Sequence, residues 1–170
     1  MALTRLGLNQ AVNLSTNTTG TLGVANGGTG RTAVTGNVLQ VIRASTTTTT
    51  TTSSTSMVDI TNLTVNITPS ATSSKIYVIM NVNGIASNGS ALAGASLRIY
   101  RASDVSGEAI NIGFGTTDAL NDSATLTALE SPSSTSELTY KGQCKNREAT
   151  AISVNNGSDT SSITVMEIAG

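Results

Sequence analysis

The sequence predicts an all-β protein, an antiparallel β-sandwich of the jelly-roll type that follows an extended N-terminal arm. From residue 37 onward, apolar segments rich in β-branched residues alternate with turn signals at a spacing of about 8–12 residues, which is typical of sandwiches. No segment has a sustained helical period. The length of 170 residues fits one domain with an appendage, and such a domain can bury an adequate core.

Residues 1–36 are predicted to form an arm that ends in a glycine-rich hinge. The apolar residues of the arm follow neither a helical nor a strand period, and they are Leu3, Leu6, Leu8, Val12 and Leu14. Glycines that permit positive φ interrupt any regular element at Gly27, Gly28 and Gly30. We therefore expect an arm over residues 1–36 and a head domain over residues 37–170. An apolar strip of this kind usually docks onto another surface, and a disordered tail is the alternative.

The first half of the head begins with two strand signals separated by a threonine tract. Residues 38–44 are rich in β-branched residues and follow a Gly-Asn turn. Residues 46–52 are all threonine, and we expect them to form an exposed connection, with a glycosylated stalk as the alternative. Within residues 57–68 the apolar phase changes at Thr61–Asn62, which predicts one inserted residue, accommodated by a β-bulge or a strand bend.

Later segments complete a set of eight or nine strands. Residues 75–83 place most apolar side chains in one phase and Ile79 in the other, so we expect a central strand partly covered on both sides. Residues 95–101 alternate, which predicts that Leu97 and Ile99 point inward. Residues 109–112 give a further strand signal, residues 125–129, 137–141 and 149–154 give weaker ones, and residues 162–168 form the last predicted strand.

The composition argues against several classes of protein. Aromatic residues make up 2% of the chain and the formal net charge is −1, so neither footprint of a nucleic-acid-binding protein is present. The chain has no histidine and one cysteine, Cys144, so no zinc site is expected and the thiol is predicted to be buried on a strand. The N-terminus lacks a continuous apolar stretch, so we expect no signal peptide, no membrane insertion and folding in a cytoplasm.

The same composition predicts self-association. A core without large rings must be built from aliphatic side chains that stabilise by about 1.5–3 kcal/mol each, so extra burial between subunits is expected. Leu63 and Ile79 lie in the second phase of their strands, where a lone sandwich would leave them exposed to water. We therefore expect a homo-oligomer closed by rotation.

The acidic residues do not predict an enzyme. Glycoside hydrolysis needs two carboxylates at a fixed separation, one of them with a raised pKa. The acids of this chain are scattered singly, mostly in or beside turns, for example at Asp104 and Asp159. Calcium needs about six to eight oxygens, which neither Asn121–Asp122 nor residues 155–159 supplies alone. No metal or other cofactor is expected.

Short motifs at both ends and in the first half of the chain form a set that can be compared with known families. The set comprises Met1–Gly7, Thr19–Leu22, Val24–Gly30, Val38–Val41 before the threonine tract, Ile67–Ser70, Ser73–Ile76 and Ser162–Ile168. In these motifs the chain resembles tail-fibre and related virion proteins of tailed bacteriophages, especially those of marine and cyanobacterial hosts. Residues 109–146 match that family only in their β character.

The resemblance implies a homotrimeric structural protein of the virion, assembled in the cytoplasm of the host bacterium. The apolar residues of the arm would attach it to other virion proteins of the baseplate, tail, neck or capsid. Typical relatives carry long shafts and this chain has none, which favours a short tail fibre whose β-sandwich head contacts the host surface. The alternative is a capsid decoration or head-fibre protein that stabilises the shell.

Contact with host surface polysaccharide would come from loops between the strands of the head. Polar residues on such loops make many weak contacts, and the candidates are Asn88, Ser90, Asn121 and Ser123. The alternative for each of them is an ordinary solvated turn residue.

Overall fold

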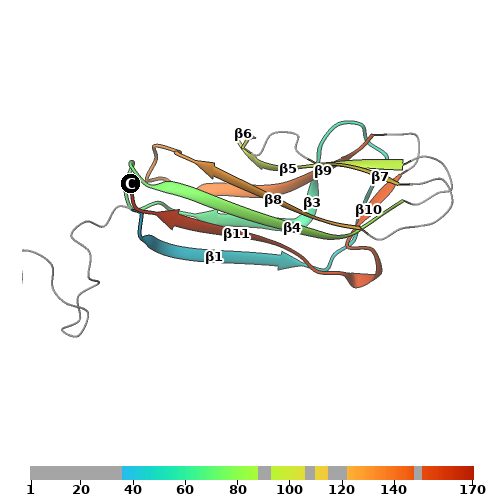
Figure 1. The fold of residues 1–170 in the computed structure, drawn as a ribbon, viewed down its shortest axis with the longest axis horizontal. Helices are drawn as coiled ribbons and strands as arrows, with labels where there is room; N and C mark the ends of the chain where they lie inside the picture. The colour runs from blue at the N-terminus through green and yellow to red at the C-terminus, as the bar shows by residue number, and fades with distance from the viewer. Residues whose placement is uncertain (1–35, 88–92, 106–109, 115–121, 148–150) are drawn as a thin grey trace, which may run out of the picture. The chain divides into compact units, whose positions relative to one another are not determined.

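The structure, a computed structural model, describes residues 36–87, 93–105, 110–114, 122–147 and 151–170. All of these residues belong to one compact unit, Thr35–Gly170. Two antiparallel sheets face each other in a β-sandwich (Figure 1), which confirms the prediction of an all-β, antiparallel sandwich. The predicted attachment and hinge residues lie outside the described residues, namely Leu3, Leu6, Leu8, Val12, Leu14, Gly27, Gly28 and Gly30.

Within the described residues, the first sheet has six strands and the second has five. In the first sheet the order is β1 (Val38–Thr46), β11 (Ser161–Ile168), β4 (Lys75–Ser87), β10 (Ile152–Val154) and β2 (Thr50–Thr52), with β8 (Asp122–Glu130) also paired to β4. In the second sheet the order is β3 (Val58–Ile67), β9 (Leu138–Asn146), β5 (Ala93–Arg101) and β6 (Ser103–Asp104), with β7 (Ile110–Phe114) also paired to β5. A short 3-10 turn, Asn156–Ser158, joins β10 to β11. Within the described residues, no helix is long and apolar enough to span a lipid bilayer.

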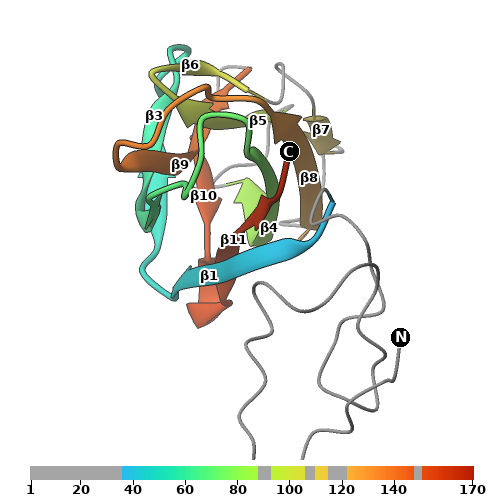
Figure 2. The same ribbon diagram turned by 90° about the vertical axis from the view of Figure 1, so that its left-hand side faces the viewer.

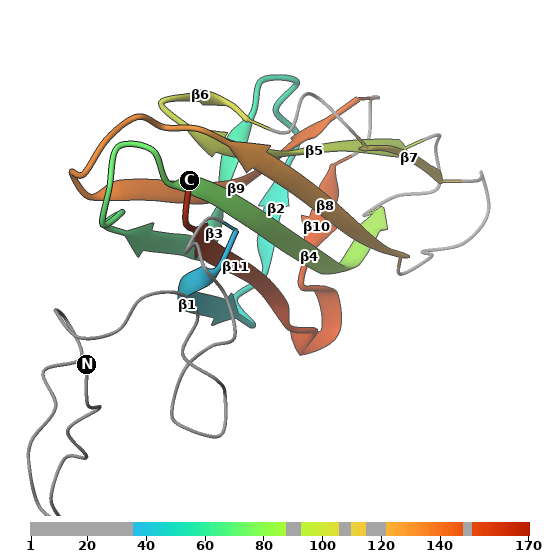
Figure 3. The same ribbon diagram turned by 60° about the vertical axis from the view of Figure 1, so that its left-hand side comes forward.

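Strand β4 is the centre of the first sheet, as Figure 3 shows. The first part of β4 pairs with β11 on one side and with β8 on the other, and its last residues pair with β10. Ile76, Val78, Met80 and Val82 are buried between the sheets, and Ile79 is half-buried on the outer side. The expectation of a central strand that is partly covered on both sides is confirmed.

The predicted β-bulge lies in strand β3. Asn62 has a φ of 61°, in the left-handed region, and the pairing register of β3 with β9 shifts between Asp59 and Thr64. The extra residue allows both Ile60 and Leu63 to point into the core, although they are three positions apart. The expectation that a lone sandwich would leave Leu63 exposed to water is therefore wrong, because the bulge turns its side chain inward.

The core between the sheets is aliphatic, with Tyr140 as its largest buried side chain. Leu97 and Ile99 point inward as predicted. Cys144 is a free, fully buried thiol on β9, which confirms its predicted place, and burial raises its pKa to about 12. Gly142 faces the core, and a Cβ there would overlap Leu63 Cδ2 and lie 2.8 Å from Met80 Sδ. The chain needs glycine at this point because the Leu63 side chain occupies the space.

The threonine tract is not wholly an exposed connection, so that expectation is wrong in part. Thr46 and Thr50 are buried, and Thr50–Thr52 form strand β2 against β10. Thr50 Oγ1 accepts a hydrogen bond from the backbone N–H of Thr61 at 2.8 Å and donates to Thr61 Oγ1 at 3.0 Å. A β-branched side chain that is also a donor and an acceptor suits this position between two sheets.

The two ends of the sandwich differ in their connections. Strand β1 begins beside the end of β11, where Gly36 N–H donates to Ala169 O at 2.6 Å and Ala169 N–H donates to Asn37 O at 2.8 Å. We name this end, which Figure 2 views, the entry end, because the chain enters the head there at Gly36. Strand β4 ends at Ser87 and β8 begins at Asp122, close to one another at the opposite end.

Candidate functional site

The predicted receptor-contact residues form no described site. Asn88, Ser90 and Asn121 lie outside the described residues. Ser123 is described, but it is the second residue of strand β8 and not a loop residue. The sequence pattern placed the start of this strand at residue 125, whereas pairing of Asp122 with Ile85 extends the strand toward its N-terminus.

A row of polar side chains instead closes the core at the entry end. Gln40, Glu167, Ile76 and Glu130 are direct neighbours across strands β1, β11, β4 and β8. Ile76 points into the core, and directly opposite residues on paired strands point to the same face. Two glutamates therefore flank a core isoleucine on the inner side of the sheet.

Glu167 is held by hydrogen bonds from three side chains and one backbone amide. Its Oε1 accepts bonds from Ser70 N–H at 2.7 Å, from Ser70 Oγ at 2.6 Å and from Ser74 Oγ at 2.6 Å. Its Oε2 accepts a bond from Gln40 Nε2 at 2.6 Å. The residue is 1% exposed. We name Glu167 with Gln40, Ser70 and Ser74 the clasp, because it joins β1, the β3–β4 connection and β11.

The hydrogen bonds of the clasp decide the ionisation of Glu167. Burial by itself would raise the pKa of the carboxyl group, because it disfavours the charged form. The bonds from Ser70, Ser74 and Gln40 favour the charged form and outweigh burial, so the pKa falls from 4.5 to about 2. Glu167 is therefore a carboxylate at neutral pH and is poorly suited to act as a general acid.

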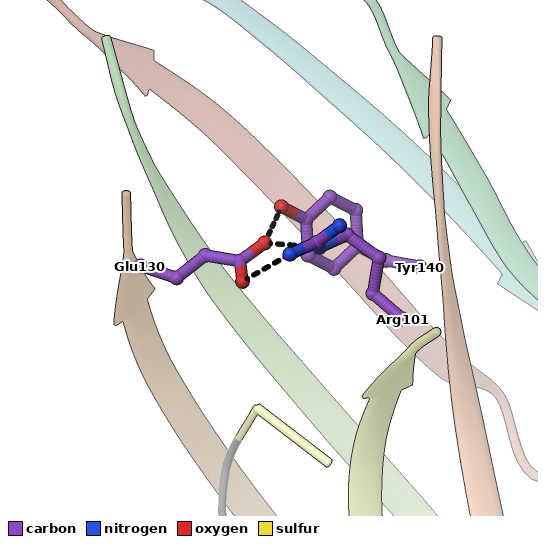
Figure 4. Close-up of polar contacts among 3 residues, drawn as sticks. All are labelled: Arg101, Glu130 and Tyr140. Carbon is purple, nitrogen blue, oxygen red and sulfur yellow. Dashed lines mark hydrogen bonds and ion pairs between the residues drawn. The ribbon is translucent and has the colours of Figure 1, made fainter. Parts of the chain in front are cut away.

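Glu130 joins the two sheets at the same end, and Figure 4 shows its contacts with Arg101 and Tyr140. Arg101, at the end of β5 in the second sheet, donates from Nε to Glu130 Oε1 at 2.6 Å and from Nη2 to Oε2 at 3.0 Å. The Tyr140 hydroxyl donates to Glu130 Oε1. The hydrogen bond to Glu130 raises the pKa of Arg101. Burial raises the pKa of Tyr140, and the hydrogen bond to Glu130 raises it further. The arrangement is a forked ion pair that holds the sheets together.

Sequence reasoning missed both glutamates, although each of them continues the inward phase of its strand. Ile163, Val165 and Glu167 occupy one phase of the last strand, so Glu167 stood at an inward position of an alternating pattern. Inward charges are rare unless they are paired, and the serines around residue 70 supply the partners. Glu130 likewise follows Ala124, Leu126 and Ala128 in the inward phase of its strand, but its partners Arg101 and Tyr140 come from the other sheet and give no local signal.

The opposite end is organised around Asn155, which is buried and has a φ of 58°. Its Nδ2 donates to Thr48 O at 3.0 Å, and its Oδ1 accepts a bond from Ser161 Oγ at 2.5 Å. Thr49 Oγ1 donates to Asn155 O at 2.9 Å. The side-chain amide therefore ties the threonine tract to the turn before β11 and is already used by the protein. Nowhere in the described parts of the chain do three or more His, Cys, Asp or Glu side chains group together as metal ligands.

The outer side of the second sheet carries a network of charged and polar side chains, which we name the charged face. Arg98 Nε donates to Gln143 Oε1 at 2.7 Å, and Gln143 Nε2 donates to Asp59 Oδ1 at 2.6 Å. Lys141 Nζ lies 2.8 Å from Asp59 Oδ2, and the Arg98 guanidinium lies 4.9 Å from the centroid of the Tyr100 ring. Burial would raise the pKa of Asp59, but hydrogen bonds from Gln143 and Lys141 lower it.

No protein-family model matches the chain, and no curated protein matches it significantly.

Proposed function

We propose that the protein is a structural protein of a tailed-bacteriophage virion, a short homotrimeric tail fibre. Residues 1–36 attach it to other virion proteins, and the β-sandwich head contacts polysaccharide on the host surface. The observation that carries the proposal is the difference between the two ends of the head. The chain enters at one end, beside Ala169, while the strands that flank connections 88–92 and 115–121 meet at the opposite end.

The order of the strands supports a jelly-roll winding, which we infer for this head. Its eight principal strands form the half-sheets β1–β11–β4–β8 and β3–β9–β5–β7. Along the chain, each connection between these eight strands crosses from one sheet to the other, except the connection from β5 to β7. Viral capsid and lectin domains use jelly rolls, and both kinds of domain bind at loops or faces of a rigid scaffold.

The clasp supports attachment through the N-terminal segment. A fibre that is held at its N-terminus transmits load into β1 at Gly36. Gln40 of β1 donates hydrogen bonds to Glu167 of β11 and to the backbone carbonyl of Thr68. The strand that would receive the load is therefore tied to two other segments soon after it enters the head.

The inner glutamates favour a structural role over a catalytic one. Glu167 is sealed from solvent and ionised, and Glu130 is held by a forked ion pair and a tyrosine hydroxyl. A glycosidase needs a carboxyl group that can reach the substrate and donate a proton. Incubation of the purified protein with host polysaccharide should release no reducing sugar, and release of such ends would contradict this part of the proposal.

Immunogold labelling of purified particles with antibodies against the head tests the location. The proposal predicts label on the tail, together with a copy number by quantitative mass spectrometry that is a small multiple of the tail's rotational symmetry. Label over the whole capsid with many more copies would identify a decoration protein instead. Absence of the protein from particles that infect normally would contradict a virion role altogether.

A further inference from the structure

The outer side of strands β1, β11, β4 and β8 carries a continuous row of apolar side chains. Val41, Met166, Tyr77 and Leu129 are paired in register, each with the next, across the four strands. Val41 is 57% exposed and Leu129 is 58% exposed, while Met166 and Tyr77 are half-buried. We name the outer side of these four strands the apolar face.

The exposed large hydrophobic residues of the described chain all lie on this sheet. They are Val38, Leu39, Val41 and Leu129, between 47% and 58% exposed. Next to the apolar row lies a row of Arg43, Thr164, Ile79 and Thr127, and beyond it a row of Ser45, Ser162, Asn81 and Thr125. The outward charges of these four strands are limited to Arg43 and Lys75. Contiguous apolar surface of this kind usually marks an interaction site.

The two outer sides of the sandwich are therefore suited to different surroundings. The charged face pairs Arg98, Asp59 and Lys141 with neighbours and suits water. The apolar face combines aliphatic side chains with hydroxyl groups, which can act as both donor and acceptor. A surface of hydroxyl and aliphatic groups can pack against a copy of itself when its like charges stay at the rim, and here Arg43 lies on the edge strand β1 and Lys75 is the first residue of β4.

The size of the apolar face also fits self-association. Four strands spaced about 4.8 Å apart, each eight residues long with a rise of about 3.3 Å per residue, cover an area of about 19 by 26 Å, or about 500 Å². Three such surfaces around a threefold axis together bury about 1,500 Å² in the assembly, which is the order of area that specific interfaces bury. Strand β1 is also an edge strand with three exposed aliphatic residues, Val38, Leu39 and Val41, and proteins normally cover such edges.

We infer that the apolar face packs against the apolar faces of other copies of this chain around a rotation axis. This inference rests on the proposed homotrimer and names the surface that forms it. The charged face then remains on the outside of the assembly. The half-buried Ile79, which the sequence placed in the second phase of its strand, lies within the interface.

Analytical ultracentrifugation of the full-length protein tests the inference with a double variant, Val41→Asp and Leu129→Asp. Both side chains are exposed in the subunit, so folding is retained, while two charges are placed in the interface. We expect the dissociation constant to rise on the order of 100-fold or more. The control is Thr139→Asp, which places one such charge on an exposed strand position on the outer side of the second sheet.

Cysteine cross-linking gives a second readout that does not depend on the stability of the variants. The chain has one native cysteine, which is buried, so an introduced surface thiol reacts alone. We expect a mixture of the Val41→Cys and Leu129→Cys proteins to form intermolecular disulfides on oxidation, and the Thr139→Cys protein to form none. A disulfide yield from Thr139→Cys equal to that of the mixture would contradict the inference.

A wild-type protein that sediments as a monomer at micromolar concentration would overturn the inference. A wild-type oligomer that survives the double aspartate variant would also overturn it, because the interface would then lie elsewhere. Neither result bears on the presence of the protein in the virion, which labelling of particles measures separately.

Discussion

Glu167 shows how a buried charge can stabilise this fold. An unpaired carboxylate in a core is strongly destabilising, whereas one with a full set of donors is tolerated and fixes the segments that supply them. The donors come from β1 and from the connection that precedes β4, so the carboxylate holds parts of the chain that are far apart in sequence, Ser70 being 97 residues away. The entry end of the head depends on this one side chain.

We predict that Glu167→Gln lowers the free energy of unfolding at pH 7 by about 3 kcal/mol, since a shift from 4.5 to about 2 corresponds to that amount. The amide keeps the shape of the side chain but presents donors to groups that already donate. Urea denaturation of both proteins measures the difference. The matched control is Glu137→Gln, an exposed residue before β9, which should change stability by less than about 0.5 kcal/mol.

Glu167 also makes the stability of the folded protein depend on pH. The pKa of Glu167 in the folded protein lies below its ordinary value, so its stabilisation is fully present above about pH 4.5 and is lost as the pH falls towards 2. The stability difference between wild type and Glu167→Gln should therefore shrink across this interval. A difference that stays constant from pH 7 to pH 3 would show that the charge of Glu167 is not what stabilises the clasp.

At the scale of single elements, the sequence predicted the strands well because their signals are local. Each of the nine predicted segments corresponds to a strand, and the bulge at Asn62 follows from the change of phase. Strand β2 was missed because a run of identical threonines has no alternation to read. The need for glycine at position 142 could not be predicted from the sequence either, because Leu63, whose side chain fills the space beside it, lies on another strand.

We predict that Gly142→Ala lowers the free energy of unfolding by about 1–3 kcal/mol, because the new methyl group overlaps the Leu63 side chain. In a background of Leu63→Ala the same substitution should cost much less, since the space has been vacated. A double-mutant cycle by chemical denaturation measures this coupling. Strictly additive changes in the free energy of unfolding would mean that the side chains at positions 63 and 142 do not compete for the same space.

Another prediction concerns the threonine tract. Thr50→Val keeps the shape of the side chain but removes the hydroxyl that bonds Thr61, so we expect a decrease of about 1–2 kcal/mol in the free energy of unfolding. Thr47→Val, at an exposed position of the same tract, is the control and should be nearly neutral. Equal effects at the two positions would indicate that the tract contributes through its backbone alone.

At the scale of the whole molecule, the spacing of strands and turns was enough to predict a sandwich. The sequence could not tell which strands pair, because pairs such as β1 with β11 join the two ends of the head. It also could not tell which outer side would be apolar, since the row across Val41, Met166, Tyr77 and Leu129 draws one residue from each of four strands. Both features become visible only when distant segments are placed side by side.

A protein that begins at Asn37 should fold as the full-length protein does. Among the described residues, this truncation removes the backbone hydrogen bond from Gly36 N–H to Ala169 O, so the melting temperature should change by less than about 5 °C. Differential scanning calorimetry measures the change. A much larger decrease would place part of residues 1–36 in the core of the head.

The central claim, that residues 1–36 hold the head on a virion, is tested most directly by incorporation of this truncated protein. Particles are produced in cells that supply either the full-length or the truncated chain, and the copies per particle are counted by quantitative mass spectrometry. The account predicts full occupancy for the full-length chain and near-complete loss of incorporation for the chain that begins at Asn37, although its head remains folded. Incorporation of the truncated chain at full copy number would contradict the account and would place attachment on the β-sandwich.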